Sequence, residues 1–120
     1  MSRSRALIVV ALVAIFVVVG GVLIYANTRG GGPKNVTFDL TVTRGESMTP
    51  SNLKARHNDT ITINVKSDQE GEVHLHEYDI AFETRPGETV SHTFKADKTC
   101  TCEIEWEATS HELGTLEVSP

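Results

Sequence analysis

The chain has 120 residues, of which 11 are lysine or arginine and 16 are aspartate or glutamate, giving a formal net charge of −5. Three of the 11 basic residues precede residue 34 and all 16 acidic residues follow it, so the rest of the chain carries a formal charge of −8. Such an acidic surface argues against binding to nucleic acid or to anionic lipid headgroups.

An uncharged apolar segment spans residues 6–26 and is rich in valine, isoleucine, leucine and alanine. As a helix with a rise of about 1.5 Å per residue it is roughly 31 Å long, enough to cross a bilayer. No polar stripe interrupts the segment, which argues against a buried core helix. Because Arg3 and Arg5 precede it without an acidic residue, residues 1–5 are predicted to stay in the cytoplasm. We therefore predict a single-pass anchor in the cell membrane, with the C-terminal domain in the periplasm or outside the cell.

A cleaved signal peptide is the alternative interpretation, with Ala26 as the last residue removed. The apolar segment exceeds the usual ~7–15 residues of a signal peptide, and Ile24 fits a small-residue cleavage site poorly, so an uncleaved anchor is favoured. Residues 27–33 include three consecutive glycines and are predicted to form a short flexible linker. Residues 34–120 then form one domain of modest size.

Beyond the linker, apolar residues recur at every second position, which is the period of a half-buried strand. The residues in this pattern are Val36, Phe38, Leu40, Val42, Ile61, Ile63, Val65, Val90, Phe94, Ile104, Trp106, Leu116 and Val118. Turn residues such as Asn58-Asp59 and Pro86-Gly87 separate the runs. About seven short strands at this spacing predict an all-β Greek-key sandwich of two sheets, without a second helix or an internal repeat.

Residues 72–82 are predicted to form one strand that contains two histidines. Strict alternation places His74 and His76 on the same face as Tyr78, Ile80 and Phe82. Two imidazoles at positions i and i+2 point the same way and can converge on a metal ion. A bulge near His76 is the alternative, and it would turn the imidazoles toward water.

Several further segments complete a family pattern. They are Met48-Thr49-Pro50, Asn58–Thr62, Glu72–Phe82, Pro86–Thr89, Thr93–Asp97 and His111–Val118. Together they resemble bacterial cupredoxin-like domains, with a distant similarity to the copper domain of cytochrome oxidase. His76-Glu77-Tyr78 is similar to the segment that supplies the first copper histidine, and His111–Val118 to the ligand loop and final strand. The resemblance implies the cupredoxin fold over most of residues 38–118 and copper as the cofactor.

The sequence departs from the ligand set of a blue copper site, which needs a thiolate, two imidazoles and a weak axial ligand. Trp106 occupies the position of the family's cysteine, and Cys102 lies four residues earlier, roughly 13 Å along an extended strand. The axial methionine is also missing, because Glu112 or Gly114 stands in its place. The resemblance therefore implies a site of imidazole and carboxylate ligands, formed by His76 and His111 with His74 or Glu107, or no site.

Cys100 and Cys102 allow three interpretations. A disulfide suits an exported domain, but residues i and i+2 of a straight strand lie about 6.5–7 Å apart, so we expect a bridge to require a broken strand. Two thiols on one face could form a second metal site for a soft ion such as Cu(I). Cys102 could also be a small buried core residue.

We find no catalytic motif, since no serine or cysteine has a recognisable base and no glycine-rich loop suits a phosphate. Glu103, Glu105 and Glu107 alternate with core residues and are predicted to form an exposed strand face. We therefore predict a membrane-tethered, non-enzymatic protein that binds copper or another transition metal for metal handling or slow redox chemistry. Its predicted partners are the membrane, through residues 6–26, and another membrane or exported protein of redox or metal handling. The alternative is a metal-free cupredoxin fold that acts as an interaction or structural module.

Overall fold

The computed structural model describes residues 31–120. The predicted cytoplasmic residues 1–5, the predicted anchor 6–26 and residues 27–30 of the predicted linker lie outside the described residues. In the part of the chain that is described, no helix combines the length and the apolar character needed to cross a membrane. Residues Asn35–Pro120 form one compact unit, which carries the features discussed below.

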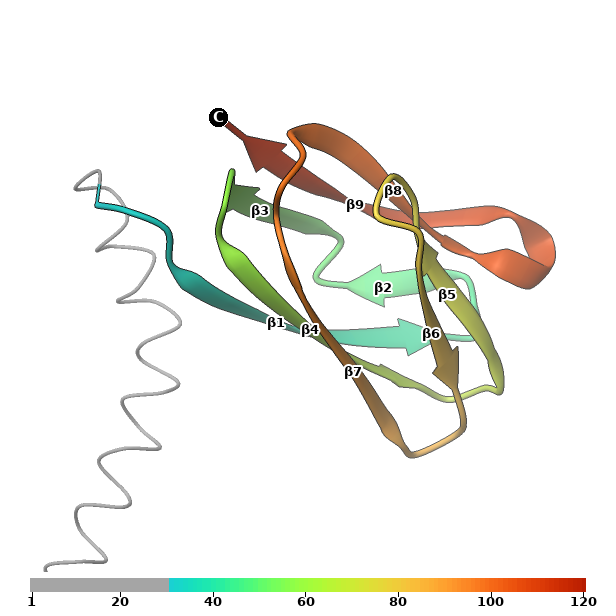
Figure 1. Cartoon of the computed structure of the whole chain (residues 1–120). Coiled ribbons are helices and arrows are strands. Elements are labelled where there is room, and N and C mark those ends of the chain that lie inside the picture. The colour runs from blue at the N-terminus through green and yellow to red at the C-terminus, as the bar shows by residue number, and fades with distance from the viewer. Residues whose placement is uncertain (1–30) are drawn as a thin grey trace, which may run out of the picture. The chain divides into compact units, whose positions relative to one another are not determined.

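The described chain folds into strands joined by short loops, with one 3₁₀ turn (Figure 1). The elements are β1 (Asn35–Thr43), β2 (Ser47–Thr49), β3 (Asn52–Arg56), β4 (Thr60–Ser67), β5 (Gly71–Leu75), β6 (Ile80–Thr84), β7 (Thr89–Lys95), β8 (Cys100–Trp106), η1 (Glu107–Thr109) and β9 (His111–Ser119). A four-stranded sheet has the order β2-β1-β4-β7, and a five-stranded sheet has the order β3-β9-β8-β5-β6. The predicted all-β sandwich of two sheets is confirmed for these residues.

Two of the strand pairs are parallel, namely β1 with β4 and β3 with β9, and the other pairs are antiparallel. The chain leaves the four-stranded sheet after β2 and enters the five-stranded sheet at β3, only two residues later. Because parallel strands need a long crossover connection, these pairs join parts of the chain that are far apart in sequence. The result is that β9, the last strand, lies beside β3.

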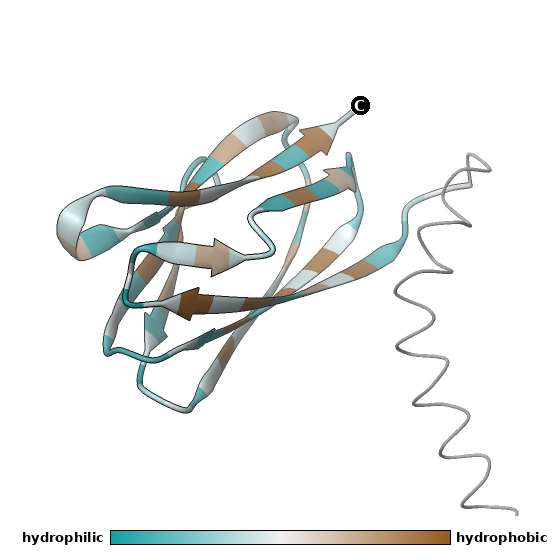
Figure 2. Cartoon of the chain, turned by 180° about the vertical axis from the view of Figure 1, so that it is seen from behind, coloured by the Kyte–Doolittle hydropathy of each residue, from teal (hydrophilic) through white to brown (hydrophobic). Residues whose placement is uncertain are grey.

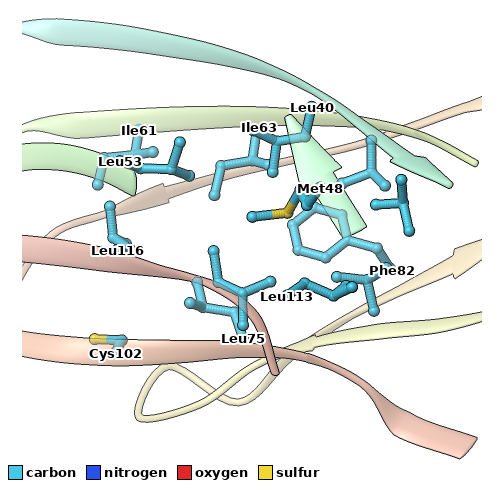
Figure 3. Packing of buried hydrophobic residues seen from close by; sticks show 14 of the residues in the cluster. Leu40, Met48, Leu53, Ile61, Ile63, Leu75, Phe82, Cys102, Leu113 and Leu116 are labelled. Atoms are coloured by element: carbon cyan, nitrogen blue, oxygen red, sulfur yellow. The ribbon is translucent and has the colours of Figure 1, made fainter. Parts of the chain in front are cut away.

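The core lies between the sheets and consists of the inward residues of each alternating strand. Ile61, Ile63 and Val65 of β4 are at most 1% exposed, as the period of two predicts. Apolar and polar bands alternate along the strands in Figure 2, and Figure 3 shows the apolar side chains meeting between the two layers. Each fully buried side chain of this size contributes about 1.5–3 kcal/mol of transfer free energy.

The predicted single strand over residues 72–82 is wrong, because the structure forms a hairpin there. β5 ends at Leu75 and β6 begins at Ile80, and the two strands pair in antiparallel register. The turn between them contains two non-glycine residues with positive φ, Glu77 at 74° and Asp79 at 54°. The turn reverses the chain and breaks the alternation, so Phe82 faces the core while His74 lies on the opposite, outer face of the five-stranded sheet.

Candidate metal site

The cluster that could hold a metal ion lies on the outer face of the five-stranded sheet, where β5 pairs with β8. His74 is paired directly with Glu105 across these strands. His76 follows the end of β5, and its backbone N–H donates a hydrogen bond of 2.9 Å to the carbonyl oxygen of Glu103. Val73 and Leu75 are fully buried on the inner face, so the pleat holds the two histidines outward.

Potential ligand atoms of His74, His76 and Glu105 all lie within 4.8 Å of one another. The two imidazole rings meet edge to face, with centroids 4.6 Å apart. His76 Nε2 lies 2.7 Å from Glu105 Oε1 and 3.8 Å from Glu103 Oε1. The two imidazoles therefore lie together on the outer face of the sheet and not, as strict alternation had predicted, on the face of Phe82.

The three side chains are partly withdrawn from water. The Glu105 side chain is 12% exposed and that of His74 is 19% exposed, whereas His76 is 37% exposed. A carboxylate with so little access to solvent needs a compensating partner. The His76 ring provides one in the absence of metal, through the 2.7 Å contact.

The two ring nitrogens of His74 have different environments. Nε2 lies 2.8 Å from Asp79 Oδ1, which sits in the hairpin turn. Nδ1 is buried and makes no hydrogen bond. Glu107 Oε1 lies 3.8 Å from it. Because a carboxylate accepts and cannot donate, we assign the proton to Nε2, which leaves a lone pair on Nδ1. A buried ring nitrogen without a hydrogen-bond partner is uncommon in folded proteins, and a bound ion is one of the explanations for it.

Carboxylates raise the pKa of His76 above its ordinary value of 6.5. The main cause is the hydrogen bond to Glu105, and the charges of Glu105, Glu103 and Glu107 add to it, while partial burial acts in the opposite direction. The carboxylates thus extend the imidazolium form of His76 to higher pH than in an ordinary histidine, and a metal ion competes with this proton.

This pKa shift predicts a dependence of stability on pH in the metal-free chain. A raised native pKa contributes stability that is complete below the unfolded value of 6.5 and disappears as pH rises through the native pKa. Unfolding by urea, with a chelator present, should show a smaller loss over this range for Glu105→Gln than for wild type. The effect should be modest, because solvent screens a ring that is 37% exposed. Identical pH profiles for the two chains would contradict the assigned His76–Glu105 pair.

The structure does not bring the predicted ligand His111 to this cluster. His111 begins β9 and pairs with Trp106, and its Nε2–H donates a hydrogen bond of 2.9 Å to the carbonyl oxygen of Glu46. Glu103 accepts the hydrogen bond from the backbone of His76, and Trp106, the partner of His111, lies three residues farther along β8. Three residues of a strand span about 10 Å, so His111 lies away from the cluster. The predicted ligand Glu107 lies at the border of the cluster, 3.8 Å from His74 Nδ1.

Sequence reasoning missed Glu105, the third member of the cluster. It interpreted Glu103, Glu105 and Glu107 as an exposed strand face, and only Glu107 was considered as a ligand. The face was predicted correctly, but Glu105 is nearly covered because the hairpin places both histidines above it. The local sequence pattern does not show that β5, which carries His74, pairs with β8, which carries Glu105.

Cys100 and Cys102 are joined by a disulfide, and the described residues contain no free cysteine. The expectation that a bridge requires a broken strand is wrong. β8 stays paired with β9 at both cysteines, and their Cα atoms are 5.4 Å apart, closer than in an ideal strand. In this form neither sulfur is a thiolate, so the pair cannot serve as the predicted second metal site.

Trp106 fills the inner side of the sandwich at the position where the resemblance places a cysteine ligand. Its indole packs so closely on Gly45 and Gly71 that a Cβ at either glycine would collide with the ring. Trp106 is 5% exposed, which agrees with the prediction that it is a core residue. A blue copper site, which requires a thiolate, does not fit this arrangement.

No protein-family model matches the sequence, and no curated protein matches it in sequence. Among solved structures, the chain is similar to a copper binding protein whose apo form was determined by NMR, with a TM-score of 0.60 and 12% identity over 73% of this chain and 97% of that protein. The blue copper oxidase of Nitrosomonas europaea gives a TM-score of 0.51 with 19% identity, and the copper nitrite reductase of the same organism gives 0.53 with 16% identity. The described domain has a cupredoxin-like fold.

The cupredoxin-like domain is much shorter than the two enzymes. It matches over 73% and 72% of its own length but covers only 39% of the oxidase and 42% of the nitrite reductase. At these identities the likeness establishes the fold, whereas ligands are determined by individual side chains. The chemistry of this chain therefore has to be argued from its own residues.

Proposed function

We propose that this chain binds copper at His74, His76 and Glu105 and serves in metal storage, delivery or sensing. The observation that carries the proposal is the convergence of His74, His76 and Glu105, each of which offers a ligand atom within 4.8 Å of the others. The buried Nδ1 of His74, which makes no hydrogen bond, supports it. Metal bonds of about 2.0–2.2 Å require ligand atoms no more than about 4.4 Å apart, so small side-chain rotations suffice.

Asp79 supports the proposal as a positioning residue. Metal-binding histidines usually donate their other ring N–H to a carboxylate, which fixes the tautomer and the ring orientation. Asp79 has this role toward Nε2 of His74, at 2.8 Å. Asp79 lies in the hairpin turn with a left-handed backbone, and its carboxylate lies beside Nε2, so the turn that reverses the chain also orients His74.

The donor set favours copper in its divalent state. Imidazole and carboxylate suit Cu(II) and Zn(II), and among divalent ions of the first transition row Cu(II) binds most tightly to such ligands. The similarity of the fold to solved copper proteins supports the same choice. Since the cluster includes no thiolate or thioether to stabilise Cu(I), metal handling fits these residues better than fast electron transfer.

The copper-loaded chain should bind one Cu(II) per molecule at this cluster and should lack the intense blue colour of a thiolate-copper site. Both expectations follow from a ligand set of two imidazoles and one carboxylate, with both cysteines in a disulfide. Metal analysis after dialysis against Cu(II) or Zn(II), together with the visible spectrum, tests them. Absence of bound metal, or an intense blue colour, would refute the proposed site.

We also propose that residues 6–26 anchor the domain on the outer side of the cell membrane, as their length and the preceding arginines predict. An exported location suits the Cys100–Cys102 disulfide. Protease added to intact cells or spheroplasts should then degrade residues 34–120. Protection of this part, with cleavage of the N-terminal end instead, would contradict the proposed orientation.

A metal-free interaction module is the second candidate function. The observation that favours it is Trp106, which fills the position of the family's thiolate ligand and is packed against Gly45 and Gly71. A partner protein of redox or metal handling would then bind the domain without exchanging metal. A titration with Cu(II) separates the two candidate functions, because only the metal-binding function requires a site of high affinity for Cu(II).

A further inference from the structure

The Cys100–Cys102 disulfide is exposed unevenly. Cys100 is the first residue of β8 and is half-buried, and its neighbours Lys98, Thr99 and Thr101 are exposed. Cys102 has no exposed surface and lies among the core side chains near Leu116 (Figure 3). Cys100 packs partly against the core but keeps some surface exposed to solvent, whereas Cys102 keeps none, so attack by a thiol from solution is expected at Cys100.

The bridge closes a very small loop. It joins residues two positions apart, so Thr101 alone lies between them. Stabilisation of the fold by a disulfide grows with the number of residues that the bridge encloses. This bridge is therefore expected to contribute little to the free energy of unfolding.

The surrounding structure does not depend on the bridge. Backbone pairing holds Cys100 opposite Val118 and Cys102 opposite Leu116. The segment that leads into β8 is held by Tyr78, whose hydroxyl donates to the carbonyl oxygen of Lys98 at 2.6 Å and accepts from its N–H at 3.0 Å. Reduced Cys102 would remain a small buried apolar residue, which is a common environment for cysteine. The fold is therefore expected to persist when the disulfide opens.

We propose that Cys100 and Cys102 form a reversible redox pair that exchanges with a dithiol of another exported protein. A partner thiolate attacks Sγ of Cys100, the S–S bond breaks, and Cys102 leaves as a thiolate that takes up a proton. The second thiolate of the partner then attacks the partner sulfur of the mixed disulfide. This step releases Cys100 as a thiolate, which also takes up a proton. The chain gains two electrons and two protons, and the partner dithiol becomes a disulfide.

Two matched variants of the full chain test the proposed asymmetry. Cys102→Ala leaves Cys100 as the accessible thiol, and Cys100→Ala leaves only the buried Cys102. With oxidised glutathione as the probe and a chelator present, Cys102→Ala should form a mixed disulfide at least about tenfold faster than Cys100→Ala. Cooperative unfolding of both variants, followed by circular dichroism, establishes that each is folded. Equal rates in two folded chains would overturn the proposal.

The wild-type chain provides a second test that needs no substitution. Dithiothreitol, as a model dithiol, should reduce the disulfide in the folded chain, and oxidised glutathione should close it again. Thiol alkylation followed by mass spectrometry measures the redox state, and circular dichroism measures the fold. Reduction only at denaturant concentrations that unfold the chain would overturn the proposal. A chelator present in both tests removes any bound metal, so the redox pair and the copper site are tested independently.

Discussion

Replacing His74 with alanine is expected to lower the affinity for Cu(II) by more than the ~10–100-fold that follows from loss of an outer-shell partner. His74 is one of the three residues of the cluster and its buried Nδ1 makes no hydrogen bond, so alanine removes a proposed direct ligand. His76→Ala and Glu105→Gln should have effects of similar size, because all three residues belong to the same set. Isothermal titration of the metal-free chains with Cu(II), in competition with a chelator, measures the change.

The controls come from histidines elsewhere in the same domain. His111 is bonded to the backbone of Glu46, and the His92 ring packs edge to face against Phe82 with centroids 4.9 Å apart. Their alanine variants should bind Cu(II) like wild type. If His111→Ala weakened binding as strongly as His74→Ala, a site shared by His76 and His111 would have to replace the present one. Unchanged affinity in every variant would favour the metal-free module.

Asp79→Ala separates a positioning role from a direct one. Asp79 contacts Nε2 of His74 and is not part of the three-residue cluster. Its loss should weaken binding within the ~10–100-fold range of outer-shell partners. The same titration with Cu(II) should give Asp79→Ala an affinity between those of wild type and His74→Ala.

The sandwich was predictable because the burial of each strand follows its own local alternation. Cys102, Ile104 and Trp106 face the core, and Glu103 and Glu105 face outward, as the period of two requires. These assignments need no knowledge of which strands pair, since each strand buries whichever face is apolar. Pairing and the order of strands in a sheet depend on contacts between distant segments, and the local pattern did not predict them.

The hairpin at residues 76–79 was not predictable from the usual turn signals. Its left-handed residues are Glu77 and Asp79, and glutamate carries no preference for positive φ. Without a glycine or proline in the turn, the alternation of residues 72–82 continued without interruption as a single strand. Because the turn was not predicted, strict alternation assigned His74 to the same face as Phe82.

The ligand Glu105 was missed for a related reason. It lies opposite His74 only because β5 pairs with β8, and 31 residues separate the two in sequence. The resemblance instead favoured His111, which the structure places beside Glu46. For the cysteines, ideal strand spacing overestimated the Cα separation, which is 5.4 Å in the structure.

Replacing Trp106 with alanine is expected to destabilise the domain by about 3–5 kcal/mol, as large-to-small changes of buried aromatic residues do. This is a large share of the roughly 5–15 kcal/mol that stabilises a typical domain. Gly71→Ala should also be destabilising, by about 1–3 kcal/mol, because its new Cβ collides with the rigid indole and not with a flexible side chain. Urea unfolding measured at constant pH gives each difference.

The double variant decides whether the two effects share one cause. Once Trp106 is alanine, the collision at residue 71 no longer exists, so adding Gly71→Ala should cost far less than it does in wild type. The coupling free energy should fall in the range of about 0.5–3 kcal/mol found for residues in direct contact. Gly32→Ala is the matched control, because nothing lies within 4 Å of a Cβ at that position, and it should leave stability unchanged. Additive costs in the double variant would mean that Gly71 is needed for its backbone and not for the space that Trp106 occupies. Close packing of the indole on Gly71 would then not be the cause of the loss of stability.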